Sequence, residues 1–88
     1  MNSEQIKKFI ETKTTGKDKY VKIEFGKREP IYGIFLTGTD YQDLSAKNFW
    51  RIVTSKNFDA YSKTNDINLA RLFNGQEFSK LSLLSDEF

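Results

Sequence analysis

The feature that most constrains this chain is a series of short apolar–polar alternations, which begins at Tyr20 and follows a single helix-like segment. In residues 20–25, Val21, Ile23 and Phe25 alternate with Tyr20, Lys22 and Glu24. This period of two is typical of a β-strand with one buried face. One helix followed by several such strands predicts a mainly β protein. We expect an N-terminal α-helix and a five-stranded antiparallel small barrel.

Turn residues divide the rest of the chain into further strands. Pro30 and the Asn74–Gly75 pair mark turns. Gly33 lies inside an apolar strand, which predicts a bend or a close approach of two backbones. The segment 55–66 is polar and irregular, so we expect a long loop or a frayed hairpin there. The predicted strands are 20–25, 31–37, 49–54, 67–73 and 76–83.

The first sixteen residues have the pattern of a capped helix. Asn2 and Gln5 have the spacing of a capping box, and Ile6, Phe9 and Ile10 form one apolar stripe. Gly16 suits the position just after a helix that ends near residue 14. At 88 residues the chain predicts one domain, with the helix in 1–16, the barrel in 20–83 and a loose tail in 84–88.

Large apolar side chains must supply the core of so short a chain. Thirteen positions are predicted to be buried on the basis of alternation and bulk. Leu69 and Leu72 have opposite parity, which predicts a bulge in the strand that holds them. The predicted core residues are Ile6, Phe9, Ile10, Val21, Ile23, Phe25, Ile34, Leu36, Trp50, Ile52, Leu69, Leu72 and Phe78.

Composition excludes several kinds of chemistry. The chain has no Cys and no His, so disulfides, thiolate metal sites and the commonest general base are excluded. It has no nucleophile elbow and no glycine-rich phosphate loop. We therefore expect a protein that is not an enzyme and uses no cofactor or metal. With no apolar run of membrane length and no signal-peptide pattern, we expect a cytoplasmic location and no membrane partner.

Two short motifs resemble those of the Sm-like superfamily, which includes the Sm and Hfq-type RNA-binding rings. Six residues after Gly33 begins Thr39-x-Tyr41-x-Asp43, where the family has Asp-x-aromatic-x-Asn. Later, Leu72-Phe73-Asn74-Gly75 resembles the apolar strand that ends in Arg-Gly in the family. The resemblance implies an SH3-like or Sm-like barrel in which Tyr41 stacks on a base. Asp43 and Asn74 replace the family's Asn and Arg, which makes the implied pocket less favourable for a polyanion.

Two classes of binding function follow, and the sequence leaves both open. The first is weak binding of single-stranded nucleic acid, in which Tyr41 stacks on a base and Lys47 neutralises a phosphate beside Asn48. Asp43 and Asn74 complete the candidate ligand-binding residues. The alternative is a module for protein–protein interaction or self-assembly without nucleic acid. Sm-like chains commonly close rings through their fourth and fifth strands, so the resemblance implies a homo-oligomer through 67–73 and 76–83.

Charge and three further positions complete the sequence-based expectations. The net charge is +2, with eight Lys and Arg against five Asp and Glu up to Pro30 and six against seven after it. Lys27-Arg28 is interpreted as a solvated turn that could contact phosphate. Arg51 is expected in an ion pair or at the rim of the barrel. Trp50 is expected in the core.

Overall fold

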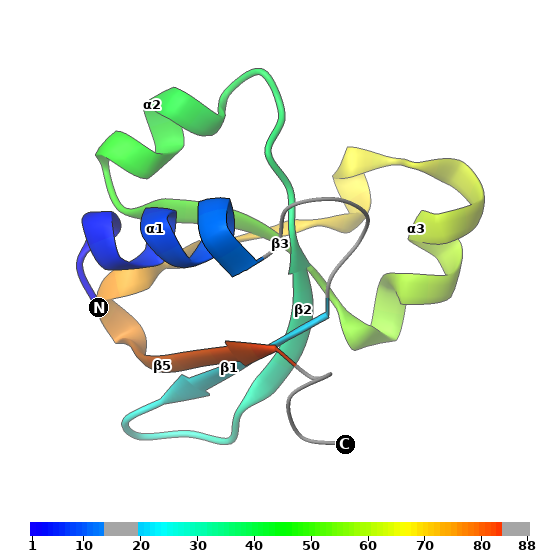
Figure 1. Cartoon of the computed structure of the whole chain (residues 1–88). Helices are drawn as coiled ribbons and strands as arrows, with labels where there is room; N and C mark the ends of the chain where they lie inside the picture. Colours follow the sequence, from blue (N-terminus) through cyan, green and yellow to red (C-terminus); the bar gives the residue numbers. More distant parts are fainter. Residues whose placement is uncertain (14–19, 84–88) are drawn as a thin grey trace.

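The computed structural model of the protein describes residues 1–13 and 20–83. The predicted helix end at residues 14–16 and the predicted tail at 84–88 lie outside the described residues. Helix α1 (Ser3–Lys13) lies across one face of the sheet (Figure 1). The capping box is confirmed: the Gln5 backbone N–H donates to Asn2 Oδ1 at 2.8 Å, and the Asn2 N–H donates to Gln5 Oε1 at 3.0 Å. These two bonds fix where the helix begins.

The five predicted strands form one antiparallel sheet. In spatial order the strands run β4-β3-β2-β1-β5, and each neighbouring pair is antiparallel. This confirms the N-terminal helix and the five-stranded antiparallel sheet. β4 and β5 are the two edges and do not pair with each other, so the sheet is not a closed barrel. The strands are β1 (Val21–Phe25), β2 (Ile31–Phe35), β3 (Phe49–Thr54), β4 (Arg71–Asn74) and β5 (Phe78–Leu83).

Two 3-10 helices shorten the last predicted strands. Residues Ile67–Leu69 form η2 instead of the start of a strand, because the side chain of Asp66 accepts a bond from the Asn68 N–H at 2.9 Å. Gly75–Glu77 form η3, in which Asn74 Oδ1 accepts from the Gln76 N–H at 2.9 Å. Such local side-chain bonds compete with strand pairing. The Asn74–Gly75 turn is therefore a link that carries the chain from one edge of the sheet to the other.

The prediction of a loop or hairpin over 55–66 is wrong. Residues Ser55–Asn57 form the 3-10 helix η1, and Phe58–Thr64 form α3. Asn65 ends α3 in the left-handed conformation, at φ 55°, which asparagine tolerates better than most residues. α3 packs against β3 on the side of the sheet away from α1 (Figure 1). Phe58 has an apolar contact there, since its ring lies 4.7 Å from that of Tyr20.

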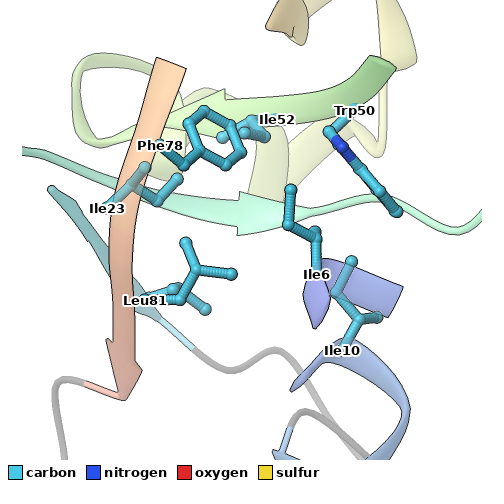
Figure 2. Packing of buried hydrophobic residues seen from close by; sticks show 8 residues of the cluster. Ile6, Ile10, Ile23, Trp50, Ile52, Phe78 and Leu81 are labelled. Carbon is cyan, nitrogen blue, oxygen red and sulfur yellow. The ribbon is translucent and has the colours of Figure 1, made fainter. Parts of the chain in front are cut away.

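The core lies between α1 and the facing side of the sheet. Figure 2 shows Ile6 and Ile10 of α1 facing side chains from β1, β3 and β5. Eight predicted core residues are buried there or under α3: Ile6, Ile10, Val21, Ile23, Ile34, Trp50, Ile52 and Phe78. Four others are only partly buried: Phe9, Phe25, Leu36 and Leu69.

One core prediction is wrong, and two core residues were missed. Leu72 is 53% exposed, because alternation along β4 turns Phe73 inward beside Trp50 and leaves Leu72 on the outer face. Val53 and Leu81 are buried but were not predicted. Val53 shares the outer face with Ile34, its partner in the β2–β3 ladder. The position of α3 over β3 accounts for the burial of this second face.

The predicted close approach at Gly33 is confirmed. A Cβ atom on Gly33 would collide with Cγ2 of Ile52 and would lie 3.2 Å from the backbone oxygen of Val53. Gly33 pairs with Val21 on one side and Thr54 on the other. The absence of a side chain therefore lets β2 and β3 pack around Ile52 at the centre of the sheet.

Candidate functional site

Tyr41, which was predicted to stack on a base, does not lie in an open loop. It begins helix α2 (Tyr41–Ala46), and its half-buried ring packs edge-on against Trp50 with centroids 6.0 Å apart. Its hydroxyl is buried and has no hydrogen-bond partner among the described residues. Burial raises the pKa of the Tyr41 phenol above 10, and the negative charge of Glu11 raises it further. Tyr41 is therefore part of the core wall.

An ion pair holds the start of α2 against the sheet. Arg51 of β3 donates through its Nη2 to Oδ2 of Asp40, the residue before α2. The Nε of Arg51 is buried and has no hydrogen-bond partner among the described residues. The expectation of an ion pair at Arg51 is thus confirmed. The pair places α2 beside β3 and brings the Tyr41 ring onto Trp50.

Asn48 uses both ends of its side chain inside the protein. Its Nδ2 donates to the Met1 carbonyl at 3.1 Å, and its Oδ1 accepts from Trp50 Nε1 at 2.8 Å. Its backbone oxygen accepts from the Gly75 N–H at 2.8 Å. The residue has a φ of 61°, which asparagine adopts at lower cost than a branched residue. Asn48 therefore joins the N-terminus, β3 and η3.

Gly75 and Met1 complete this arrangement, which we call the Asn48–Gly75 junction (Met1, Asn48, Trp50, Gly75 and Phe78). The Met1 amino group donates to the Gly75 oxygen at 3.1 Å and to the Phe78 oxygen at 2.6 Å. Gly75 is buried. A Cβ atom there would collide with Asn48 Oδ1 and would crowd the indole nitrogen of Trp50. Only glycine fits this position without displacement of its neighbours.

The five predicted ligand-binding residues fall into three groups. Asn48 and Asn74 lie close together, because Asn74 pairs with Phe49 and precedes Gly75, but the side chains of both already have internal partners. Tyr41 is half-buried and packs against Trp50. Asp43 and Lys47 are exposed on α2 and just after it. Three of the five predicted binding residues are thus engaged inside the protein, and only Asp43 and Lys47 are exposed.

The sequence predicted an available edge in the fourth strand but missed the exposed apolar side chains on the outer face of β4. Leu72 is 53% exposed and Phe49, on the neighbouring strand, is 38% exposed. Leu72 pairs with Arg51 and Asn74 pairs with Phe49, so these four side chains share the outer face. We call this surface the β4 face (Phe49, Arg51, Leu72 and Asn74). The opposite parity of Leu69 and Leu72 was the available signal, since one of the two had to leave the core.

The backbone of β4 also offers unpaired groups. Gly75 donates to the oxygen of Asn48, the residue directly opposite it in the ladder. Hydrogen-bonded and non-hydrogen-bonded residues alternate along an antiparallel pair of strands. The backbone N–H and C=O groups of Arg71 and Phe73 therefore point toward β3. The N–H and C=O groups of Leu72 therefore point away from the sheet. A free edge of this kind is a template for another strand.

The second missed feature is a pocket between the β1–β2 turn and η3. It is lined by Phe25, Gly26, Lys27, Arg28, Gln76 and Glu77. The guanidinium carbon of Arg28 lies 4.0 Å from the centre of the Phe25 ring. The sequence signal was the Lys27-Arg28 pair, which was interpreted as a solvated turn that could contact phosphate.

Comparison of the chain with protein-family models, with curated proteins and with solved structures finds no match. No helix within residues 1–13 and 20–83 is long and apolar enough to cross a membrane. In the same part of the chain, no three Asp or Glu side chains gather as a metal-ion site would require.

Proposed function

We propose that this chain is a non-catalytic binding module that pairs the free edge of β4 with a strand of a second copy of the chain. The observation that supports this most directly is the open edge itself: the backbone groups of Leu72 point away from the sheet beside the exposed side chains of Leu72 and Phe49. Backbone bonds at such an edge provide affinity, and neighbouring apolar side chains add buried area.

The same sheet supplies a partner for this edge. β5 is the other edge strand, at the opposite end of the sheet, and its Ser79 and Lys80 are exposed. β4 of one copy against β5 of the next makes a head-to-tail contact, which closes into a ring if the rotation between copies allows it. The Sm-like resemblance of the sequence implies the same pair of strands. We propose this contact as the basis of assembly.

The mass of the protein in solution tests the proposal. Light scattering of the full chain should show a mass that rises with concentration into the high micromolar range. Leu72→Pro removes the outward N–H without removing a donor to β3, so it should reduce association strongly. Leu72→Lys places a charge on the β4 face and should do the same. A thermal melt of each variant establishes that it is folded.

The matched control is Ile67→Ser. Ile67 is 55% exposed but lies in η2, outside the β4 ladder, so its replacement should leave the mass unchanged. A strict monomer at all concentrations would contradict self-assembly. Equal association of the wild type and both folded Leu72 variants would show that the contact between copies does not involve β4.

Binding of single-stranded nucleic acid through Tyr41, Lys47 and Asn48 stays a prediction. Tyr41 packs on Trp50 and Asn48 holds the junction, so Tyr41→Ala would change stability as well as any base stacking. Lys47 is exposed, and Lys47→Gln is therefore the cleaner variant. If the prediction holds, Lys47→Gln should bind labelled oligonucleotides more weakly than the wild type at low salt, as measured by fluorescence anisotropy.

A further inference from the structure

We propose that the pocket between the β1–β2 turn and η3 binds a nucleoside monophosphate, whether free or at the end of a strand. This goes beyond the proposed assembly, since none of the pocket residues belongs to the β4 face. The ligand class follows from three properties of the pocket: a cation stacked on an aromatic ring, a second cation without a carboxylate partner among the described residues, and an amide and a carboxylate in the same lining.

The first property is a flat surface of positive charge. Arg28 lies over the Phe25 ring at 4.0 Å. That ring is itself fixed, because it packs edge-on against buried Phe78 with centroids 5.5 Å apart. A guanidinium held on a ring in this way presents its other side to the pocket, and planar bases stack well on guanidinium groups.

The second property is a pair of cations that can bind an anion. The Lys27 ammonium and the Arg28 guanidinium have no hydrogen bond or ion pair with any described carboxylate. Both residues come from one turn and line the pocket. Lys and Arg together are suited to a phosphate, which accepts charge-assisted hydrogen bonds from both.

The third property is an amide and a carboxylate in the same lining. Gln76 and Glu77 of η3 also line the pocket, and neither side chain has a hydrogen bond within the described residues. An amide and a carboxylate both accept bonds from the N–H groups of a base edge. A bare anion would use only the two cations, whereas a nucleotide has a phosphate, a flat ring and N–H groups. The base edge of guanine carries N–H donors that an amide oxygen and a carboxylate can accept, so GMP is the probe.

An NMR titration of the full chain with three compounds tests the assignment. GMP should shift the backbone amide signals of residues 25–28 and 76–77 and reach saturation. Guanosine, which lacks the phosphate, and inorganic phosphate, which lacks the ring, should each bind at least about tenfold more weakly. Phosphate binding equal to that of GMP would overturn the nucleotide assignment and leave a simple anion site. No GMP shifts at millimolar concentration would overturn the site itself.

A short oligoguanylate with a 5′-phosphate distinguishes the two sources of the ligand. If the oligoguanylate binds more tightly than GMP and shifts the same amide signals, the ligand is the end of a nucleic-acid strand. Binding no tighter than that of GMP would assign the free nucleotide. Shifts confined to residues 41–48 would contradict the pocket and support the site predicted around Tyr41.

Three variants locate the binding. Arg28→Leu removes the stacked cation, and Lys27→Gln removes the second charge; each should weaken GMP binding about tenfold. Gly26 lines the pocket, and a Cβ atom on it would have no other atom within 4 Å. Gly26→Leu therefore adds bulk at the lining without a collision at Cβ and without a change in charge. It should abolish binding.

Lys56→Gln is the matched control, since Lys56 is an exposed lysine of η1 outside the pocket. It should bind GMP as the wild type does. Thermal melts should show that all four variants are folded. GMP binding by Gly26→Leu at the wild-type level, or an equal loss in Lys27→Gln and Lys56→Gln, would overturn the assignment to this pocket.

Discussion

The Asn48–Gly75 junction and the β4 face lie at adjacent positions of one ladder, yet they use their polar groups in opposite ways. In the junction, the side chain of Asn48 bonds to Met1 and Trp50, and the Gly75 N–H bonds to the Asn48 oxygen. At the β4 face, Leu72 leaves its backbone groups unpaired and its side chain exposed. In the junction, a residue type that suggests ligand contacts therefore has a structural role. At the β4 face, the groups available for binding another strand belong to the backbone.

The largest expected effect comes from Gly75→Ala. Its Cβ atom would meet Asn48 Oδ1, Ile6 Cδ1 and Trp50 Nε1 at once, so it should lower the free energy of unfolding by about 3 kcal/mol. Urea denaturation measures the change. The matched control is Gly38→Ala, whose Cβ would have only an ordinary contact with Asp40, at 3.8 Å. Equal effects at the two glycines would mean that the junction is not tightly packed.

Asn48→Ala should lower the free energy of unfolding by about 2–3 kcal/mol. It leaves the Trp50 N–H without its acceptor and places alanine at a φ of 61°. Asn65 provides the control, because it has a similar φ of 55° and an exposed side chain. Asn65→Ala should cost only about 1 kcal/mol. A loss at Asn48 no larger than that at Asn65 would show that the side-chain bonds of the junction contribute little.

Gly33→Val extends the comparison to the centre of the sheet. We expect a loss of roughly 1–3 kcal/mol, because the new side chain meets Ile52 and the backbone of Val53. Thermal or urea denaturation gives the value. An unchanged midpoint would indicate that β2 and β3 move apart at small cost. The contact of the two strands at Gly33 would then be loose.

The smallest effect is expected for Tyr41→Phe. Near pH 7 the change should be neutral or stabilising by less than about 1 kcal/mol, since the buried hydroxyl has no described partner. The pKa of Tyr41 is raised above 10 in the folded protein, so the unfolded chain loses this proton first. Wild-type stability should therefore fall as the pH rises past 10, more steeply than that of Tyr41→Phe. Parallel pH profiles of the two proteins would contradict the burial of this hydroxyl; Tyr20→Phe, at an exposed ring, is the control.

The parts of the fold that follow from alternation were predictable from the sequence. The strand at 49–54 has the predicted bounds, and Trp50 and Ile52 face the core as expected. The capping box at Asn2 and the ion pair of Arg51 also follow from local spacing or from the cost of an unpaired charge. The capping partners are close in sequence, and the core residues alternate on one strand. For Arg51 the sequence predicted only that an ion pair would form, since its partner Asp40 precedes another element.

The parts that were not predictable depend on contacts between distant segments. Phe58 stabilises α3 by its contact with Tyr20. Tyr41 lies in a polar segment of the sequence but packs against Trp50. The parity of Leu69 and Leu72 indicated a conflict, which the structure resolves by placing Leu69 in η2 and Leu72 on the outer face of β4. The candidate site changed for the same reason, because the internal partners of Asn48 include Met1, which lies far from it in the sequence.

Hydrogen exchange at the Leu72 amide tests the central claim, that the β4 edge pairs with another strand, most directly. The Leu72 N–H points away from the sheet, whereas the adjacent Phe73 N–H faces β3 and serves as an internal reference. We expect the exchange of Leu72 to slow as the protein concentration rises from low micromolar to near millimolar, while that of Phe73 stays constant. Fast exchange of Leu72 at every concentration would contradict the proposed role of the β4 edge.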